Sequence, residues 1–314
     1  MNEETHLQDI VYALAASPDF LQEGICFAAR PSGLFRSTDA GRSWQDAYAS
    51  LDLQAPLATA AVALSPAFHT DRTVFAGVSG GVLRSTDAGQ TWLAASFPDP
   101  PPFVSALAIS PDFANDGTLF AATLEDGVFR SGDRGNHWAA WNFGLLDLNV
   151  LALAISPDFA HDETLFAGTE SGLFRSTNGG RAWREVNFPS DLAPVLCLAI
   201  SPQYVTDATL FAGTESHGLF LSRDGGATWT RLAEGQLNGA VNTILLAPQF
   251  PAQPDLLVLH EDALLVSRDG GAQWEDWPID PPLAEAIASV AAPQGLAPDA
   301  PLLVGLMDGS VVRI

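Results

Sequence analysis

The chain of 314 residues is 47% hydrophobic and 16% charged, a composition that is typical of a folded globular protein and excludes a largely disordered one. Its fourteen basic residues, all arginine, stand against thirty-seven acidic ones and leave a net charge of −23, which argues against binding of nucleic acid or of an anionic membrane surface. The lack of lysine excludes a Schiff-base lysine, a P-loop lysine and a kinase-type ATP-binding lysine.

The N-terminus carries neither a basic segment nor an apolar one, so no signal peptide is visible. The longest apolar runs have the length of a strand and are too short for a membrane-spanning helix. The expected location is the cytoplasm, and a chain trimmed before Met1 would leave an extracytoplasmic location open. Two cysteines, Cys26 and Cys197, are too few for a disulfide framework and are expected to be reduced core residues.

One pattern of three apolar runs repeats along the chain. It has the form V-x-A-L-A-I-S-P-D-F, then a polar loop, then T-L-F-A-G-T, then G-L-F-R-S. Short runs of β-branched and aromatic residues, separated by Gly, Pro and Asp, are typical of β-strands. The first run recurs seven times, beginning near Val11, Ala60, Val104, Val150, Val195, Val241 and Ile287.

A box of eight residues follows the third run in six of the repeats. It reads Ser, then Asp or Asn two residues later, Gly two after that and Trp three further on. The six boxes are Ser37–Trp44, Ser85–Trp92, Ser131–Trp138, Ser176–Trp183, Ser222–Trp229 and Ser267–Trp274. Their tryptophans are spaced by 48, 46, 45, 46 and 45 residues, and a fourth strand after each Trp makes every repeat a four-stranded antiparallel meander. Such repeats predict an all-β fold, a seven-bladed β-propeller.

The last repeat lacks a box because the chain stops at Ile314. An open blade would leave an unpaired strand edge, so the segment from Asn2 to Gln8 is expected to close the seventh sheet as its outer strand; a three-stranded last blade is the alternative. Residues 1–314 are predicted to form one propeller domain. The expected blades are 9–56, 57–102, 103–148, 149–193, 194–239, 240–285, and 286–314 together with 1–8.

The box resembles the Asp-box, or BNR, repeat of sialidases, xyloglucan-cleaving glycosidases, sortilin-type receptors and photosystem II assembly-factor propellers, and the resemblance covers essentially the whole chain. It implies a structural turn, on the face opposite the active sites of the propeller enzymes: the acid accepts turn N–H groups, Gly supplies a positive φ, and Trp packs beneath the sheet. No box has the clustered carboxylates of a calcium loop, so no metal and no other cofactor is predicted. The residues with this structural role are Asp39, Trp44, Asp87, Trp92, Asp133, Trp138, Asn178, Trp183, Asp224, Trp229, Asp269 and Trp274.

No catalytic residue is assigned. A sialidase needs an arginine triad and a tyrosine nucleophile, but the chain has only Tyr12, Tyr48 and Tyr204, and Tyr204 replaces the core Phe of the S-P-x-F element. A pair of carboxylates for glycoside hydrolysis remains open, because the separation of two acids is not visible in a sequence. The uniform spacing of the repeats nevertheless leaves no room for the long insertions with which the family's glycosidases build a cleft.

One candidate binding surface is a ring of arginines at a single position of the third strand. Blades five and six interrupt it with Leu221 and Val266. Each guanidinium is expected either to stack on an aromatic residue or pair with a box carboxylate, or to form part of an anion- or protein-binding patch. The second reading resembles the arginine patch of the photosystem assembly-factor propellers. The members of the ring are Arg36, Arg84, Arg130, Arg175 and Arg313.

A second candidate surface is the face formed by the loops between the second and third strands and between successive blades, where propellers usually bind. These loops are acidic, which predicts either solvated loops or a site for a cation or a basic protein. Adjacent residues such as His260 and Glu261 rarely converge on one ion, so no metal site is assigned. The candidates are Glu125, Asp126, Glu170, Glu215, His217, His260, Glu261, Asp262 and Asp308.

A regular disc without insertions or a visible catalytic set predicts a non-enzymatic scaffold that binds another protein, in the manner of an assembly factor. The alternative is a carbohydrate-binding or glycoside-hydrolase or lyase-type propeller of the same family. A protein partner is therefore expected, a glycan is possible as the alternative ligand, and neither nucleic acid nor membrane insertion is expected.

Overall fold

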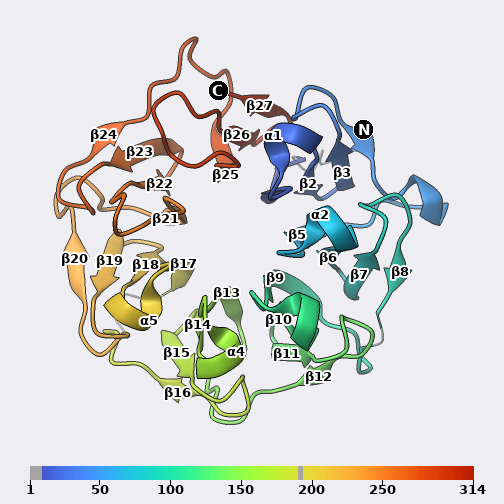
Figure 1. Ribbon diagram of the computed structural model, residues 1–314, viewed down its shortest axis with the longest axis horizontal. Helices are drawn as coiled ribbons and strands as arrows, with labels where there is room; N and C mark the ends of the chain where they lie inside the picture. The colour runs from blue at the N-terminus through green and yellow to red at the C-terminus, as the bar shows by residue number, and fades with distance from the viewer. Residues whose placement is uncertain (1–8, 96, 190–193) are drawn as a thin grey trace, which may run out of the picture.

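The computed structural model describes residues 9–95, 97–189 and 194–314. Seven small antiparallel sheets form a ring, and within each sheet the strands follow one another in chain order from the centre outward (Figure 1). The predicted seven-bladed β-propeller is confirmed.

The blades share one strand plan. The innermost strands are β1 (Ala13–Ala16), β5 (Thr59–Leu64), β9 (Phe103–Ile109), β13 (Val150–Ile155), β17 (Val195–Ile200), β21 (Val241–Leu246) and β25 (Ile287–Ala291). The second strands are β2 (Cys26–Arg30), β6 (Val74–Val78), β10 (Leu119–Leu124), β14 (Leu165–Thr169), β18 (Leu210–Thr214), β22 (Leu256–His260) and β26 (Leu303–Leu306). The third strands are β3 (Gly33–Ser37), β7 (Gly81–Ser85), β11 (Gly127–Ser131), β15 (Leu173–Ser176), β19 (Leu219–Ser222), β23 (Ala263–Ser267) and β27 (Val311–Arg313). The outer strands are β4 (Gln45–Asp46), β8 (Leu93–Ala94), β12 (Ala139–Ala140), β16 (Arg184–Glu185), β20 (Thr230–Leu232) and β24 (Glu275–Asp276).

The seventh blade has three strands within the described part of the chain, in the order β25, β26, β27. The outer strand predicted for Asn2 to Gln8 lies outside the described residues. The first and last blades are nevertheless joined near the centre, because the N–H of Val11 donates to the carbonyl of Leu306 at 3.2 Å. The hydroxyl of Ser289 donates to the carbonyl of Val11 at 2.8 Å. Main-chain atoms of residue 11 thus close the ring.

The polar loop predicted after each first strand contains a one-turn helix in five blades. Its first residue is the aromatic residue of the S-P-x-F element, which is buried against the neighbouring blade. The serine before it donates to the last acid of the turn, as Ser65 Oγ does to Asp71 Oδ2 at 2.6 Å. These helices are α1 (Phe20–Glu23), α2 (Phe68–Asp71), α3 (Phe113–Asp116), α4 (Phe159–Asp162) and α5 (Tyr204–Asp207).

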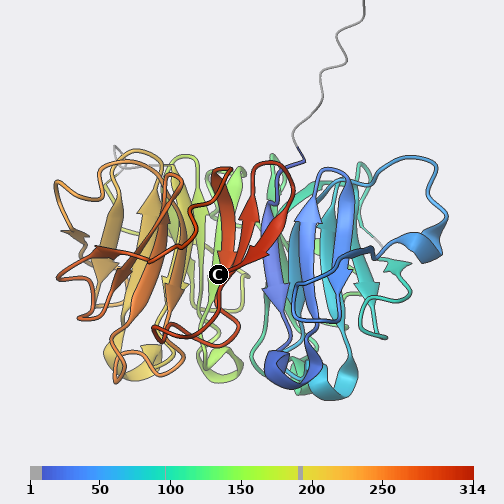
Figure 2. The ribbon, with the colours of Figure 1, turned by 90° about the horizontal axis from the view of Figure 1, so that it is seen from above.

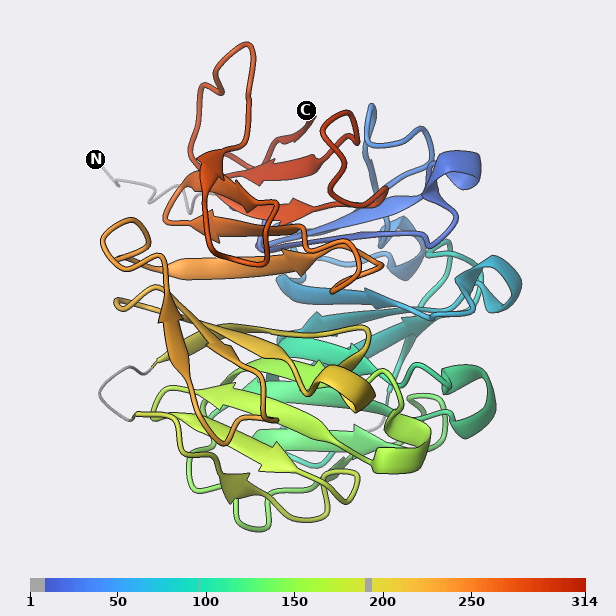
Figure 3. The ribbon, with the colours of Figure 1, turned by 60° about the vertical axis from the view of Figure 1, so that its left-hand side comes forward.

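The disc has two different faces (Figure 2). We call the side with α1–α5 and the box turns the helix face, and the side with the hairpins between second and third strands and the segments that link blades the connection face. Figure 3, seen from another side, shows the short helices projecting from the same side of the ring. On the helix face a main-chain bond ties each box to the loop beside it, as between the N–H of Ala40 and the carbonyl of Gly24 at 2.9 Å.

The core lies between blades rather than at one centre. In antiparallel sheets the two partners of a pair share a face, so Phe27 and Arg36 both point toward the next blade. Aromatic residues that follow an outer strand contact the box tryptophan of the next blade. The ring centroids are 5.5 Å apart for Tyr48 and Trp92 and 5.1 Å apart for Phe188 and Trp229. Packing across blade boundaries therefore holds the disc together.

Candidate functional site

The box acids close their turns. In the first box, Oδ1 of Asp39 accepts from the hydroxyl of Ser37 at 2.8 Å and the N–H of Ser43 at 2.9 Å, and Oδ2 accepts from the hydroxyl of Ser43 at 2.6 Å. These bonds, above all those from Ser43, lower the pKa of Asp39 to about 2. Both oxygens of the Asp39 carboxylate thus accept hydrogen bonds from residues of the turn itself.

The box tryptophans lie between blades, and not simply beneath their own sheet as expected. Trp92 and Trp183 are buried and donate their indole N–H groups to main-chain carbonyls of the preceding blade, at 2.9 Å and 2.8 Å. Trp44, Trp229 and Trp274 are half-buried and donate within their own box. Trp138 is buried as well, but its indole N–H has no partner among the described residues. The six positions thus fall into a buried and a half-buried class that the shared motif does not distinguish.

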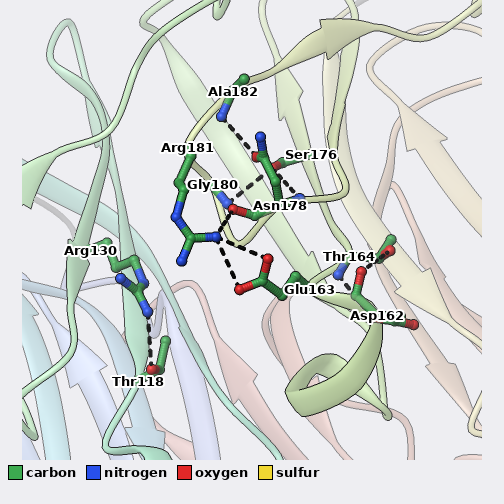
Figure 4. A network of polar contacts seen from close by, with 10 residues as sticks. All are labelled: Thr118, Arg130, Asp162, Glu163, Thr164, Ser176, Asn178, Gly180, Arg181 and Ala182. Atoms are coloured by element: carbon green, nitrogen blue, oxygen red, sulfur yellow. Dashed lines mark hydrogen bonds and ion pairs between the residues drawn. The ribbon is translucent and has the colours of Figure 1, made fainter.

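The fourth box differs from the others in its polar contacts (Figure 4). Its Asn178 accepts from the hydroxyl of Ser176 and from the N–H of Ala182, both at 2.9 Å. Residue 182 has no hydroxyl, so the side-chain bond made by Ser43 in the first box is missing here. Arg181 beside it donates to both carboxylate oxygens of Glu163, at 3.0 Å and 2.9 Å. This turn therefore carries no negative charge of its own.

The predicted arginine ring lies mainly between blades. Arg84 donates to the carbonyl of Arg134 in the next box at 2.8 Å, and Arg130 stacks over Trp141 with its guanidinium carbon 4.4 Å from the ring centroid. Burial lowers the pKa of Arg130 and of Arg36. The four arginines of blades one to four are half-buried, whereas Arg313 is exposed. The ring is thus not one continuous open patch.

The predicted loop-face residues all lie on the connection face, each on the hairpin of its own blade. Their carboxylates are exposed, whereas His217 and His260 are half-buried. His260 accepts the N–H of Gly239 through Nε2 at 3.1 Å. Within the described part of the chain, no group of three or more His, Cys, Asp or Glu residues is arranged to hold a metal ion.

The strands that surround the centre of the disc carry no charged residue. None of the seven innermost strands, all of which lie among the described residues, contains Asp, Glu, Arg, Lys or His. Burial raises the pKa of Cys26 and of Cys197 to about 12, which leaves both thiols protonated and unreactive at neutral pH. Carboxylates for acid–base chemistry would have to come from the loops.

Two features were missed by the sequence reading. The first is the segment that links blades three and four, in which Phe143 is 80% exposed and Leu146 is 79% exposed. The signal was present, because the sequence from Trp141 to Asn149 is apolar where a linking loop is usually polar. The second is an open groove of about 450 Å³ between blades four and five, at the box that contains Asn178.

Comparison with known proteins supports the propeller fold and assigns the chain to no family. No family model matches the chain, and no curated protein matches it. Among solved structures, YCF48 bound to a D1 peptide has 16% identity and a TM-score of 0.69 over 98% of this chain and 92% of that chain. A GH74 xyloglucanase from Xanthomonas campestris has 17% identity and a TM-score of 0.71 over 98% of this chain and 52% of that one.

The extracellular domain of a one-component system protein from B. thetaiotaomicron has 16% identity and a TM-score of 0.71. The match covers 98% of this chain but only 38% of that protein. At such identities the likeness concerns the propeller fold alone. No helix within the described residues is long and apolar enough to cross a membrane.

Proposed function

We propose that this propeller is a non-enzymatic scaffold that binds a partner protein through the segment that links blades three and four. The observation that carries the proposal is the exposure of Phe143 and Leu146, three residues apart on one loop. Exposed apolar side chains are common singly, but a group of them with polar surroundings is typical of a protein-binding site. Asp147 belongs to this segment, and the main chain of the acidic hairpin residues Glu125 and Asp126 is bonded to Asn149 and Asn142 of the same segment.

The loop is held in place rather than free to fold its apolar residues inward. The N–H of Leu145 donates to the carbonyl of Asn142 at 2.9 Å, and the carbonyl of Phe143 accepts the N–H of Trp183 at 2.8 Å. Asn142 also bonds the neighbouring hairpin, since its amide oxygen accepts from the N–H of Val128 at 2.8 Å. Such fixed presentation lowers the entropic cost of binding, because the loop needs no ordering.

The fold neighbours include a propeller that binds a peptide, YCF48 with its D1 peptide. A peptide or an exposed loop of a partner protein is accordingly the kind of ligand that we propose here. Carboxylates around the apolar loop favour a partner segment that combines apolar and basic side chains, because complementary charge accelerates and orients association.

The test is capture from native lysate with the tagged chain and with the double variant Phe143→Ser, Leu146→Ser. We expect the double variant to lose at least nine-tenths of a stoichiometric partner, since buried aromatic and aliphatic anchors dominate interfaces. The matched control is Leu21→Ser, because Leu21 is 78% exposed on the helix face. Equal recovery of the partner by wild type and double variant would contradict the proposal, and a lost partner with Leu21→Ser would point to the other face.

Carbohydrate binding is the second candidate, and the exposed ring of Phe143 favours it because sugars stack on exposed aromatic rings. One fold neighbour is a xyloglucanase. Titration with xyloglucan oligosaccharides distinguishes the two candidates. Saturable binding that Phe143→Ser abolishes would support the carbohydrate reading, and a lack of binding together with partner loss in the capture experiment would support the scaffold.

A further inference from the structure

The groove between blades four and five lies where a pair of arginines on neighbouring strands meets the one box that has Asn in place of Asp. Its walls come from the fourth box, the outer strand β16 and the box of blade five. Two arginines, Arg175 and Arg184, and two amides, Asn178 and Asn187, line it, with Glu185 as the one acid. Although the chain has a net charge of −23, arginines outnumber acids in the lining of this groove.

The two arginines are direct cross-strand neighbours. Arg175 of β15 pairs with Arg184 of β16 in the antiparallel register. Like charges at directly opposed positions of a sheet destabilise it. The first three blades place an uncharged residue opposite the same ring arginine, and these residues are Gln45, Leu93 and Ala139. Among the blades that keep the ring arginine opposite an outer strand, only the fourth has such a like-charge pair, and a bound anion would relieve the repulsion within it.

The box beside the pair does not provide that charge. Five boxes carry Asp at the position where the fourth has Asn178, and the residue four positions on, Ala182, has no hydroxyl. Within the described part of the chain, neither Arg175 nor Arg184 has a carboxylate oxygen within 4.0 Å of its guanidinium nitrogens. Glu185 is the one acid among the described residues that line the groove and forms no ion pair with either arginine, and Arg175 stacks over Phe166 with its guanidinium carbon 5.6 Å from the ring centroid.

Donors of the pair remain available. Arg175 makes one long bond, from Nη1 to the carbonyl of Gly225 at 3.3 Å, and its buried Nε has no partner among the described residues. Arg184 is exposed on the neighbouring strand. The Nε atoms of Arg36 and Arg130 at the same ring position are buried in the same way, so a ligand in the groove would be held by the Nη atoms of Arg175 and by the guanidinium of Arg184.

We infer that this groove is a binding site for a small oxyanion, a phosphate or carboxylate group held by Arg175 and Arg184. Guanidinium groups bind such groups through pairs of parallel N–H···O bonds, and the planar fork of arginine fits both kinds. The amides of Asn178 and Asn187 supply neutral donors at the rim, and Asn178 keeps the box turn closed without repelling the ligand. Neither Phe143 nor Leu146 lines the groove, so anion binding is tested without changing either side chain of the proposed scaffold surface.

Isothermal titration calorimetry at constant ionic strength tests the inference, with inorganic phosphate and with citrate as probes. We expect saturable binding of at least one probe at one site per chain. Binding of phosphate alone would identify a phosphate-bearing ligand, and binding of citrate alone a carboxylate-bearing one. Arg184→Gln should weaken binding at least tenfold, because it removes one charged donor from the pair.

The double variant Asn178→Asp, Ala182→Thr rebuilds the standard box and puts a carboxylate into the groove wall. We expect it to fold and to lose binding at least tenfold. The matched control is Arg42→Gln, which removes the same charge from an exposed box residue of blade one. The inference is overturned if neither probe binds, or if Arg184→Gln and the rebuilt box bind as tightly as wild type does. Because Arg184 is exposed, its variant is expected to fold, so a loss of binding reports on the site and not on the stability of the disc.

Discussion

The box aspartates show how a single exposed carboxylate can be committed to its own turn. The hydroxyl and N–H of Thr228 and the hydroxyl of Ser222 donate to Asp224 and hold its pKa at about 2. The corresponding contacts hold the pKa of Asp39 at about 2. Hydrogen bonds to the charged form, and not a nearby cation, are the main cause of both shifts.

These lowered pKa values predict acid sensitivity. A group whose pKa is lowered by folding contributes stability that is complete above its unfolded pKa and disappears as pH falls through the folded one. For Asp39 and Asp224 that window runs from the ordinary value of 3.8 down to about 2. The double variant Asp39→Asn, Asp224→Asn should show a shallower loss of unfolding free energy across this window, measured by urea denaturation at a series of pH values. Identical slopes for both proteins would contradict the explanation.

Burial separates tryptophans that the motif treats alike. Trp183 is 3% exposed and packs with the buried side chains of Leu145 and Phe174, whereas Trp44 is half-buried. Trp183→Ala should lower the free energy of unfolding by about 3–5 kcal/mol, the usual cost of removing a large buried aromatic side chain. Trp44→Ala is the comparison and should cost clearly less. Chemical denaturation measures both, and an equal loss would show that the two packing classes are not energetically distinct.

At the scale of the strand, glycine allows blades to approach closely. A Cβ atom at Gly168 of β14 would lie 2.8 Å from Cγ1 of Val195, on the first strand of the next blade. Gly168→Ala should therefore lower stability by about 1–3 kcal/mol through overpacking. Gly132→Ala is the control, because a Cβ atom there would meet only the guanidinium of Arg130, at an ordinary contact distance of 3.9 Å, and its backbone is not left-handed. Thermal denaturation distinguishes them, and an unchanged midpoint for Gly168→Ala would mean that the blades can move apart at no cost.

The elements could be predicted from the sequence to different extents. A period of about 46 residues, with three apolar runs and a box, was enough to predict the order of strands in each blade, because every blade packs against its neighbours in the same way. One-turn helices such as α2 escaped prediction, since four residues are too few to display a helical period. Repetition also gave the position of the ring arginines but not their surroundings. Whether Arg84 faces solvent or the next box depends on how blades are juxtaposed, which no single repeat encodes.

The candidate binding features were harder to predict for the same reason. Phe143 and Leu146 belong to a segment that is unique to one blade junction, and only the solvent exposure of both side chains distinguishes them from core residues. The pair of Arg175 and Arg184 depends on the register between β15 and β16. Asn178 was visible as a departure from the motif, but its meaning depends on that neighbouring pair.

For the whole molecule, the excess of negative charge is a destabilising term. A net charge of −23 is distributed over a compact disc, so the carboxylates repel one another over distances comparable with the screening length of dilute buffers. Raising sodium chloride from about 10 mM to about 150 mM shortens that length to about 8 Å and should raise the melting temperature. A calorimetric scan at constant pH measures the shift. A lower melting temperature in salt would mean that the few ion pairs outweigh the repulsion.

The bond between each box and the loop beside it has a consequence for how such a molecule can change over time. It is made by main-chain atoms, as between the N–H of Arg134 and the carbonyl of Gly117 or the N–H of Gly225 and the carbonyl of Ala208. Almost any residue can supply those atoms, so duplicated blades can diverge in side chains while the disc keeps its dimensions. The fourth box illustrates this, because its side chains depart from the motif while the N–H of Gly179 still donates to the carbonyl of Glu163 at 2.9 Å.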